Sequence, residues 1–252
     1  MGTRTVRTAV IMALLGALFM LSACKKQEAP VAGGQAREHV QEKLKQGFEE
    51  SKKVVVARVN GEAITEFSLL REMNSLRPEY LKAGQRSGPG LDAKIWNDAL
   101  EVLITQDLAV QEAARQGMKA DPKMVDDALG RIRKEAGSAE AYQKYLADNG
   151  LTESELRTAI GRDALFEMIA AREVDARIKV TDGELKALYA KEKTGLKDSA
   201  HREMSFAEAR PMLEQRARAE AAAKRMAQWE KELRKNARIE IVEEKKQEGK
   251  RS

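Results

Sequence analysis

The sequence predicts a mainly α-helical protein in which strands from the two ends of the folded part form a small two-stranded sheet. Its 4% aromatic and 34% charged residues are typical of helices with wide solvated faces. Apolar residues recur at helical spacing through most of the chain, and only residues 54–59 and 238–244 are β-like. A large compact catalytic domain is not the first expectation for such a chain.

Residues 1–23 have the layout of a secretory signal. Arg4 and Arg7 precede an apolar run over residues 9–21, and the small residues Ser22 and Ala23 follow it. This order is typical of a signal peptide rather than of a membrane-spanning helix. We therefore predict that the chain is exported.

Cys24, the single cysteine of the chain, follows the signal directly in the stretch "LSAC". This stretch resembles the lipobox of bacterial lipoproteins, which implies that Cys24 is acylated and anchors the protein to a membrane. The alternative is an ordinary signal peptide with a chance cysteine. The predicted location is the periplasmic side of the inner or outer membrane, and Lys25, in place of an aspartate, permits outer-membrane sorting by the same resemblance.

The segments that flank the folded part are predicted to be a tether over residues 24–53 and a disordered tail over residues 245–252. Pro30, Gly33 and Gly34 interrupt the tether, which has room for at most a short helix after Gln35. Removing residues 1–23 takes away two arginines and no acidic residue, so the net charge falls from +5 to +3. So small a charge argues against a nucleic-acid partner.

Three similar phrases mark helix starts: "ITEFSL" from Ile64, "LTESEL" from Leu151 and "VTDGEL" from Val180. In each phrase the threonine hydroxyl can cap a free backbone N–H. The acids Glu155 and Glu184 can complete capping boxes. The stretch "SFAE" from Ser205 is a further start of the same kind.

Helix ends follow from proline and glycine. The first helix, from Thr65, carries Leu69, Leu70, Met73 and Leu76 on its inner side and is expected to stop before Pro78. The other predicted helices cover residues 92–116, 121–136, about 139–149, 152–176, 181–193 and 205–236. Asp121 and Pro122 stand in the favoured order for a cap and first helical residue.

The strand over residues 54–59 needs a partner, and the run "RIEIVEE" from Arg238 is the only other β-like stretch after the signal. Two strands alone are marginally stable in water, so helices must support the pair. Pairing these strands would bring the two ends of the folded part together.

The phrase "ARVNGEAIT", the helix-rich middle, "VTDGELKALYAKEK" and the final long helix before "ARIEIVEE" together resemble the SurA and PrsA class of extracytoplasmic folding factors. The resemblance covers most of residues 54–244. It implies a SurA-like chaperone domain in which the first and last strands pair and which cradles unfolded polypeptide. The function it implies is that of an ATP-independent holdase for exported or outer-membrane proteins.

The sequence departs from this class in the interval where a prolyl-isomerase domain is expected. Members of the class usually carry parvulin prolyl-isomerase domains between the "TDGEL" helix and the last long helix, and here that interval is only about residues 194–204. Its one histidine, His201, is expected to be a solvated loop residue. We predict that the protein is not an enzyme. The alternatives are an isomerase with a degenerate site and an adaptor lipoprotein for one envelope partner.

No cofactor, metal site, catalytic residue or small-molecule substrate is expected, because the chain has two isolated histidines and no phosphate-loop or nucleophile motif. Flexible methionine side chains suit contact with varied peptides. Ordinary core filling is the alternative for each of them, and oligomerisation stays open. The candidate client-binding residues are Met73, Met118, Met124, Met168, Met212 and Met226.

Overall fold

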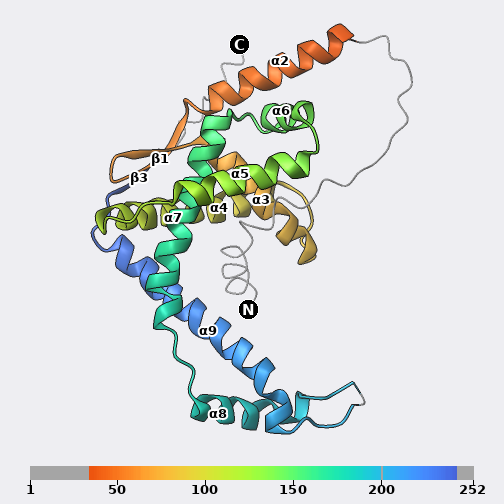
Figure 1. Cartoon of the computed structure of the whole chain (residues 1–252), viewed down its shortest axis with the longest axis vertical. Helices are drawn as coiled ribbons and strands as arrows, with labels where there is room; N and C mark the ends of the chain where they lie inside the picture. The colour runs from red at the N-terminus through yellow and green to blue at the C-terminus, as the bar shows by residue number, and fades with distance from the viewer. Residues whose placement is uncertain (1–33, 200, 243–252) are drawn as a thin grey trace, which may run out of the picture. The chain divides into compact units, whose positions relative to one another are not determined.

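The computed structural model describes residues 34–199 and 201–242, with side chains from residue 41 onward. The predicted signal, Cys24 and the predicted tail over 245–252 lie outside this range. Within this range the chain forms eight α-helices and a three-stranded sheet (Figure 1). The predicted mainly α-helical fold is confirmed. None of the helices in the described range is both long and apolar enough to cross a membrane.

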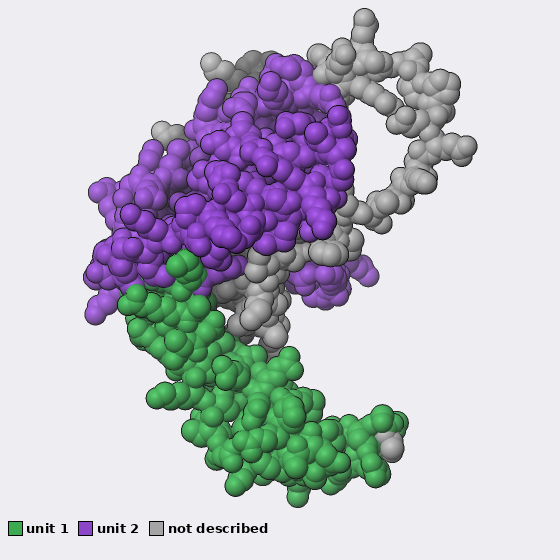
Figure 2. All heavy atoms as spheres, viewed as in Figure 1, with its two compact units in different colours: residues 1–12, 168–232 green, residues 13–167, 233–252 purple. Residues whose placement is uncertain are grey.

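The chain divides into two compact units, coloured separately in Figure 2. The described residues of unit 2 are 34–167 and 233–242, and those of unit 1 are 168–199 and 201–232. Unit 1 is therefore inserted into the sequence of unit 2. Helices α7 (Glu153–Glu173) and α9 (Phe206–Arg234) each contribute residues to both units.

The sheet of unit 2 is antiparallel with the strand order β2-β1-β3. Its strands are β1 (Val55–Val59), β2 (Glu62–Thr65) and β3 (Ile239–Ile241). The predicted pairing of the first and last strands is confirmed, but the prediction of only two strands is wrong. Asn60 and Gly61 have φ angles of 52° and 92°, which is the backbone that a two-residue hairpin requires. The chain therefore turns back at once and forms β2.

Strand β1 pairs with the last strand over residues 57–59. Ala57 lies opposite Ile241, and Val59 lies opposite Ile239. Beyond the strand, the Asn60 N–H donates to the Arg238 carbonyl and the Asn60 Oδ1 accepts from the Arg238 N–H, both at 2.8 Å. The first and last strands of the folded part are therefore hydrogen-bonded to each other, as the sequence predicts.

Helices α3 (Glu66–Lys82) and α4 (Pro89–Arg115) pack against each other, and both contact strand β1. The Thr65 hydroxyl accepts from the Ser68 N–H and caps α3. The expected stop before Pro78 is wrong, because α3 continues through Pro78 to Lys82. Tyr80, with 3% of its surface exposed, anchors this last turn against α4.

A core cluster of unit 2 joins α3 to α5 (Pro122–Ala136), α6 (Ala139–Asp148) and the first part of α7. Asp121 caps α5 through the Lys123 N–H, and Gly137 ends it at φ 82°. The buried members of the cluster are Phe67, Val125, Leu129, Ile132, Tyr142, Leu146, Leu151 and Leu156.

Helix α2 (Gly34–Ser51) occupies most of the predicted tether. The expectation of at most a short helix there is wrong, since the helix runs for 18 residues. Its last turns pack on the body because the Phe48 ring meets the Phe67 ring edge-on at 5.9 Å, and Lys52 pairs with Glu155 at 2.9 Å. A Cβ atom on Gly150 would lie 2.4 Å from Phe48, so this contact needs glycine there.

Unit 1 is built from α8 (Asp182–Glu192) and the greater part of α9, with the short 3-10 helices η1 (Asp175–Arg177) and η2 (Lys193–Gly195). Thr181 with Glu184 and Ser205 with Glu208 form the predicted capping boxes. Leu185, Leu196, Ala209 and Leu213 form the buried core of this unit. The two helices are thus fixed against each other by an apolar contact.

Candidate binding surface

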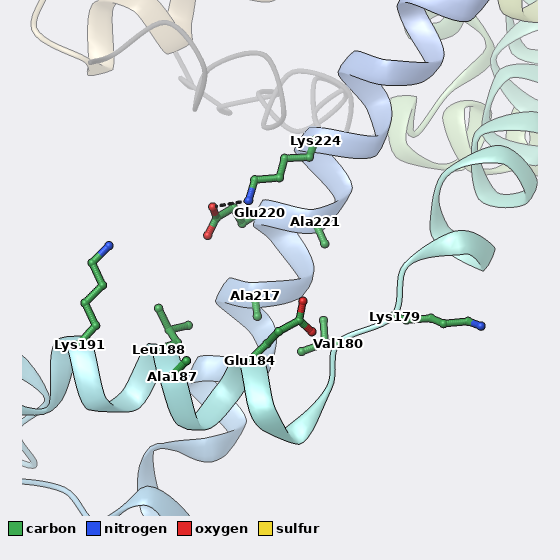
Figure 3. A pocket seen from close by; sticks show the side chains of 10 residues that line it. All are labelled: Lys179, Val180, Glu184, Ala187, Leu188, Lys191, Ala217, Glu220, Ala221 and Lys224. Carbon is green, nitrogen blue, oxygen red and sulfur yellow. Dashed lines mark ion pairs between the residues drawn. The ribbon is translucent and has the colours of Figure 1, made fainter.

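A groove lies between α8 and α9 within unit 1 (Figure 3). Its volume is about 420 Å³ and it opens to solvent. The residues that line it are Lys179, Val180, Glu184, Ala187, Leu188, Lys191, Ala217, Glu220, Ala221 and Lys224.

The floor of the groove is apolar, and alanines form much of it. Ala187 comes from α8, and Ala217 and Ala221 come from successive turns of α9. Val180 and Leu188 complete the floor and pack against the buried core of the unit. A concave apolar surface with charged residues around it is suited to bind apolar side chains of another molecule.

Each acidic residue of the rim has a partner in its own helix or at the start of that helix. The Glu184 carboxylate accepts from the Thr181 backbone N–H at 2.8 Å and from its hydroxyl at 2.9 Å. Glu220 pairs with Lys224 at 3.0 Å (dashed in Figure 3). These hydrogen bonds lower the pKa of both carboxyl groups, through the Thr181 backbone for Glu184 and through Lys224 for Glu220. Both are therefore carboxylates at neutral pH.

Two lysines of the rim differ from Lys224, since neither Lys179 nor Lys191 forms an ion pair within the described residues. Figure 3 shows them toward opposite ends of the groove, Lys191 on α8 and Lys179 on the segment that precedes it. The groove thus has an apolar floor with a positive charge near each end.

The groove is lined by lysine, glutamate and apolar residues. Its lining contains no histidine, cysteine, serine or tyrosine. In the part of the chain that the structure describes, no group of three or more histidine, cysteine and acidic residues could hold a metal ion. The arrangement of an apolar floor and a charged rim can bind a ligand.

The segment between α8 and α9 that contains His201 is small. Its described residues form η2 and a single β-bridge between Lys197 and Glu203. His201 is exposed, with a φ angle of 61°, and its N–H donates to the Asp198 carbonyl in a tight turn. These residues contain no sheet of their own.

The candidate methionines are scattered over both units and none of them lines the groove. Met124 and Met212 are exposed, at 49% and 39%. Met118, Met168 and Met226 are half-buried. Met73 is only 8% exposed and packs inside unit 2, which leaves it unavailable to a ligand.

Two residues of α3 differ from the expected inner face. Leu70, expected inside, has 46% of its surface exposed, while Glu72 is only 7% exposed. Burial and, to a lesser degree, the charge of Asp163 raise the pKa of Glu72 to about 7. Its Oε1 atom has no hydrogen-bond partner. Helical spacing from Leu69 and Leu76 could have found this position, because Glu72 lies three and four residues from them.

Comparison with known proteins gives the family. The sequence profile of the SurA-like N-terminal domain matches residues 6–170, which is more than half of the chain. The matched part ends within α7, so α8, α9 and the groove lie beyond it.

Curated relatives agree with the profile. The chain is 31% identical over 132 residues to the chaperone SurA of Chromobacterium violaceum, which covers 52% of this chain and 30% of the relative. It is 27% identical to the chaperones SurA of Hahella chejuensis, over 55% of this chain and 32% of the relative, and of Pseudomonas aeruginosa, over 54% and 32%. The match spans about a third of the length of these relatives. The chain belongs to the SurA-like N-terminal domain family.

Proposed function

We propose that this protein is a chaperone that binds unfolded segments of exported proteins and delays their aggregation, without ATP and without catalysis. The observation that carries the proposal is the family match over residues 6–170, together with relatives that are named chaperones. The apolar groove of unit 1 adds a surface suited to such binding. By holding the unfolded state, the protein would lower the concentration of free aggregating chains.

The place of action that we propose is the periplasmic side of a membrane, with Cys24 as the lipid anchor. This rests on the signal-like residues 1–23 and on "LSAC", both of which precede the described residues. An anchored holdase would meet its clients as they emerge on that side of the membrane.

The proposal that the protein is not an enzyme rests on the segment between α8 and α9. The family resemblance places an isomerase domain there, whereas the described residues of this segment form only η2 and one β-bridge. An isomerase pocket needs a sheet and an apolar floor of its own, and these residues supply neither.

Two assays of the purified protein test the function. We expect it to suppress light scattering by an unfolded outer-membrane protein diluted from urea at equimolar ratio, without added ATP. We also expect no acceleration of cis-trans exchange in a proline-containing tetrapeptide above the uncatalysed rate. Isomerase turnover that His201→Ala abolishes would contradict the proposal.

A pull-down of envelope proteins separates a chaperone from an adaptor. Many unfolded clients together with suppressed scattering support the chaperone. One specific partner together with unchanged scattering would replace the chaperone by an adaptor lipoprotein.

A further inference from the structure

Three lysines and two glutamates line the groove of unit 1. Glu184 is held by Thr181 and Glu220 by Lys224, whereas Lys179 and Lys191 have no ion pair among the described residues. All three lysines of the rim are exposed. The rim therefore has a net charge of +1, and the two lysines without an ion pair stand toward opposite ends of the groove (Figure 3).

We propose that this groove binds an extended, apolar stretch of polypeptide that has acidic residues on both sides. The inference rests on the proposed chaperone function and names the class of segment that this site selects. The apolar side chains would lie on Ala187, Ala217 and Ala221, whose small side chains leave the floor open. The flanking carboxylates would pair with Lys179 at one end and Lys191 at the other (Figure 3).

The charge of the chain's own C-terminal segment makes it a poor ligand for the groove. Residues 245–252 contain four basic residues and one acidic residue. Such a segment would be repelled by Lys179 and Lys191, while an acidic segment of another protein would be attracted. The occupant that fits is therefore a client chain.

The test uses the full chain with Cys24→Ser and two fluorescent peptides. The peptides share one central apolar stretch and carry either aspartates or lysines on both sides. We expect the acidic peptide to bind about three- to ten-fold more tightly at low salt, because exposed ion pairs are individually weak. The preference should shrink as salt is added.

A charge reversal and a matched control place the preference in the groove. The variant Lys179→Glu/Lys191→Glu should invert the order of the two peptides. The variant Lys186→Glu/Lys193→Glu makes the same change in net charge at exposed lysines outside the groove lining, and should keep the order. Filling the floor with Ala221→Leu should weaken binding of both peptides.

The inference is overturned if the reversal variant keeps the wild-type order, or if Ala221→Leu leaves both affinities unchanged. It is also overturned if the wild type binds both peptides equally. In each of these cases the proposed function stands as long as the wild type suppresses aggregation. If the wild type neither binds the peptides nor suppresses aggregation, both proposals fall. Circular dichroism melts of every variant confirm that the comparison is made between folded proteins.

Discussion

Glu72 on α3 is a buried carboxyl group with one unpartnered oxygen, and its pKa is raised to about 7. A raised pKa means that the folded protein holds the proton more tightly than the unfolded chain does. This group therefore favours folding below pH 4.5, and its contribution is lost as the pH rises through 7. A shift of this size corresponds to about 3 kcal/mol.

Glu72→Gln removes that ionisation. We expect the variant to be more stable than the wild type by about 1–3 kcal/mol at pH 8, with a smaller difference at pH 5. Urea unfolding at the two pH values measures it. Glu135→Gln, an exposed residue of α5, is the control, and a difference that does not depend on pH would contradict the assignment.

Two glycines make a matched pair for backbone conformation. Gly61 sits at φ 92° in the hairpin turn, while Gly130 lies inside α5 with open space around the position of a Cβ atom. Gly61→Ala should destabilise the protein by about 1–2 kcal/mol because of the positive φ. Gly130→Ala should stabilise it by about 0.5–1 kcal/mol. Thermal melts that show the same sign for both variants would refute this reading.

At the scale of single residues, the sequence predicts burial correctly where residue type and helical period agree. Leu69, Met73 and Leu76 satisfy both conditions and are buried. At Leu70 and Glu72 the residue type and the helical period predict opposite burial, and in both cases the observed burial follows the helical period. The groove lysines could not be predicted, since α8 and α9 come together only through the core of unit 1.

Strand β3 stabilises the sheet through its backbone hydrogen bonds more than through the burial of its side chains. Ile241 has 52% of its surface exposed, so its burial contributes less than its type suggests. The other contribution of this strand is the set of backbone hydrogen bonds from residues 238–242 to β1 and Asn60. Each of them stabilises the fold by about 1 kcal/mol. Ending the chain after Ala237 should cost about 3–5 kcal/mol, a large part of a typical total of about 5–15 kcal/mol.

Two controls accompany that truncation. Ending the chain after Glu244 should leave the melting temperature unchanged, and Ile241→Thr should change the unfolding free energy by less than about 0.5 kcal/mol. Equal melting temperatures for the two truncations would mean that β3 does not support the fold.

At the scale of elements, the prediction succeeded where the signal is local. The capping pairs Thr152–Glu155, Thr181–Glu184 and Ser205–Glu208 each lie within one turn and are confirmed. The hairpin strand β2 was missed although Asn60 and Gly61 are a strong turn signal. The extent of α2 was underestimated, and the docking of Phe48 beside Gly150 could not be predicted because it joins distant parts of the chain.

At the scale of the whole molecule, we propose that acylation of Cys24 decides where the protein works. Cys24→Ser should move the protein from the membrane fraction to an unprocessed or soluble form, because the acyl chains that we propose would be absent. Fractionation and intact mass measure this. Ser22→Thr, which keeps the cysteine, is the control. Unchanged fractionation and mass in Cys24→Ser would remove the lipid anchor from the proposal.

The pairing of β1 with β3 also sets an order of events during synthesis. The hairpin of β1 and β2 is complete early, yet the partner of the other β1 edge follows much later, since Arg238 lies 178 positions after Asn60 in the sequence. Until then one edge of β1 exposes unpaired backbone groups that any extended chain could bind. Contacts so distant in sequence also form slowly. A protein that we propose to guard others against aggregation therefore passes through a stage in which its own sheet is open to mispairing, and this stage ends only with its last strand.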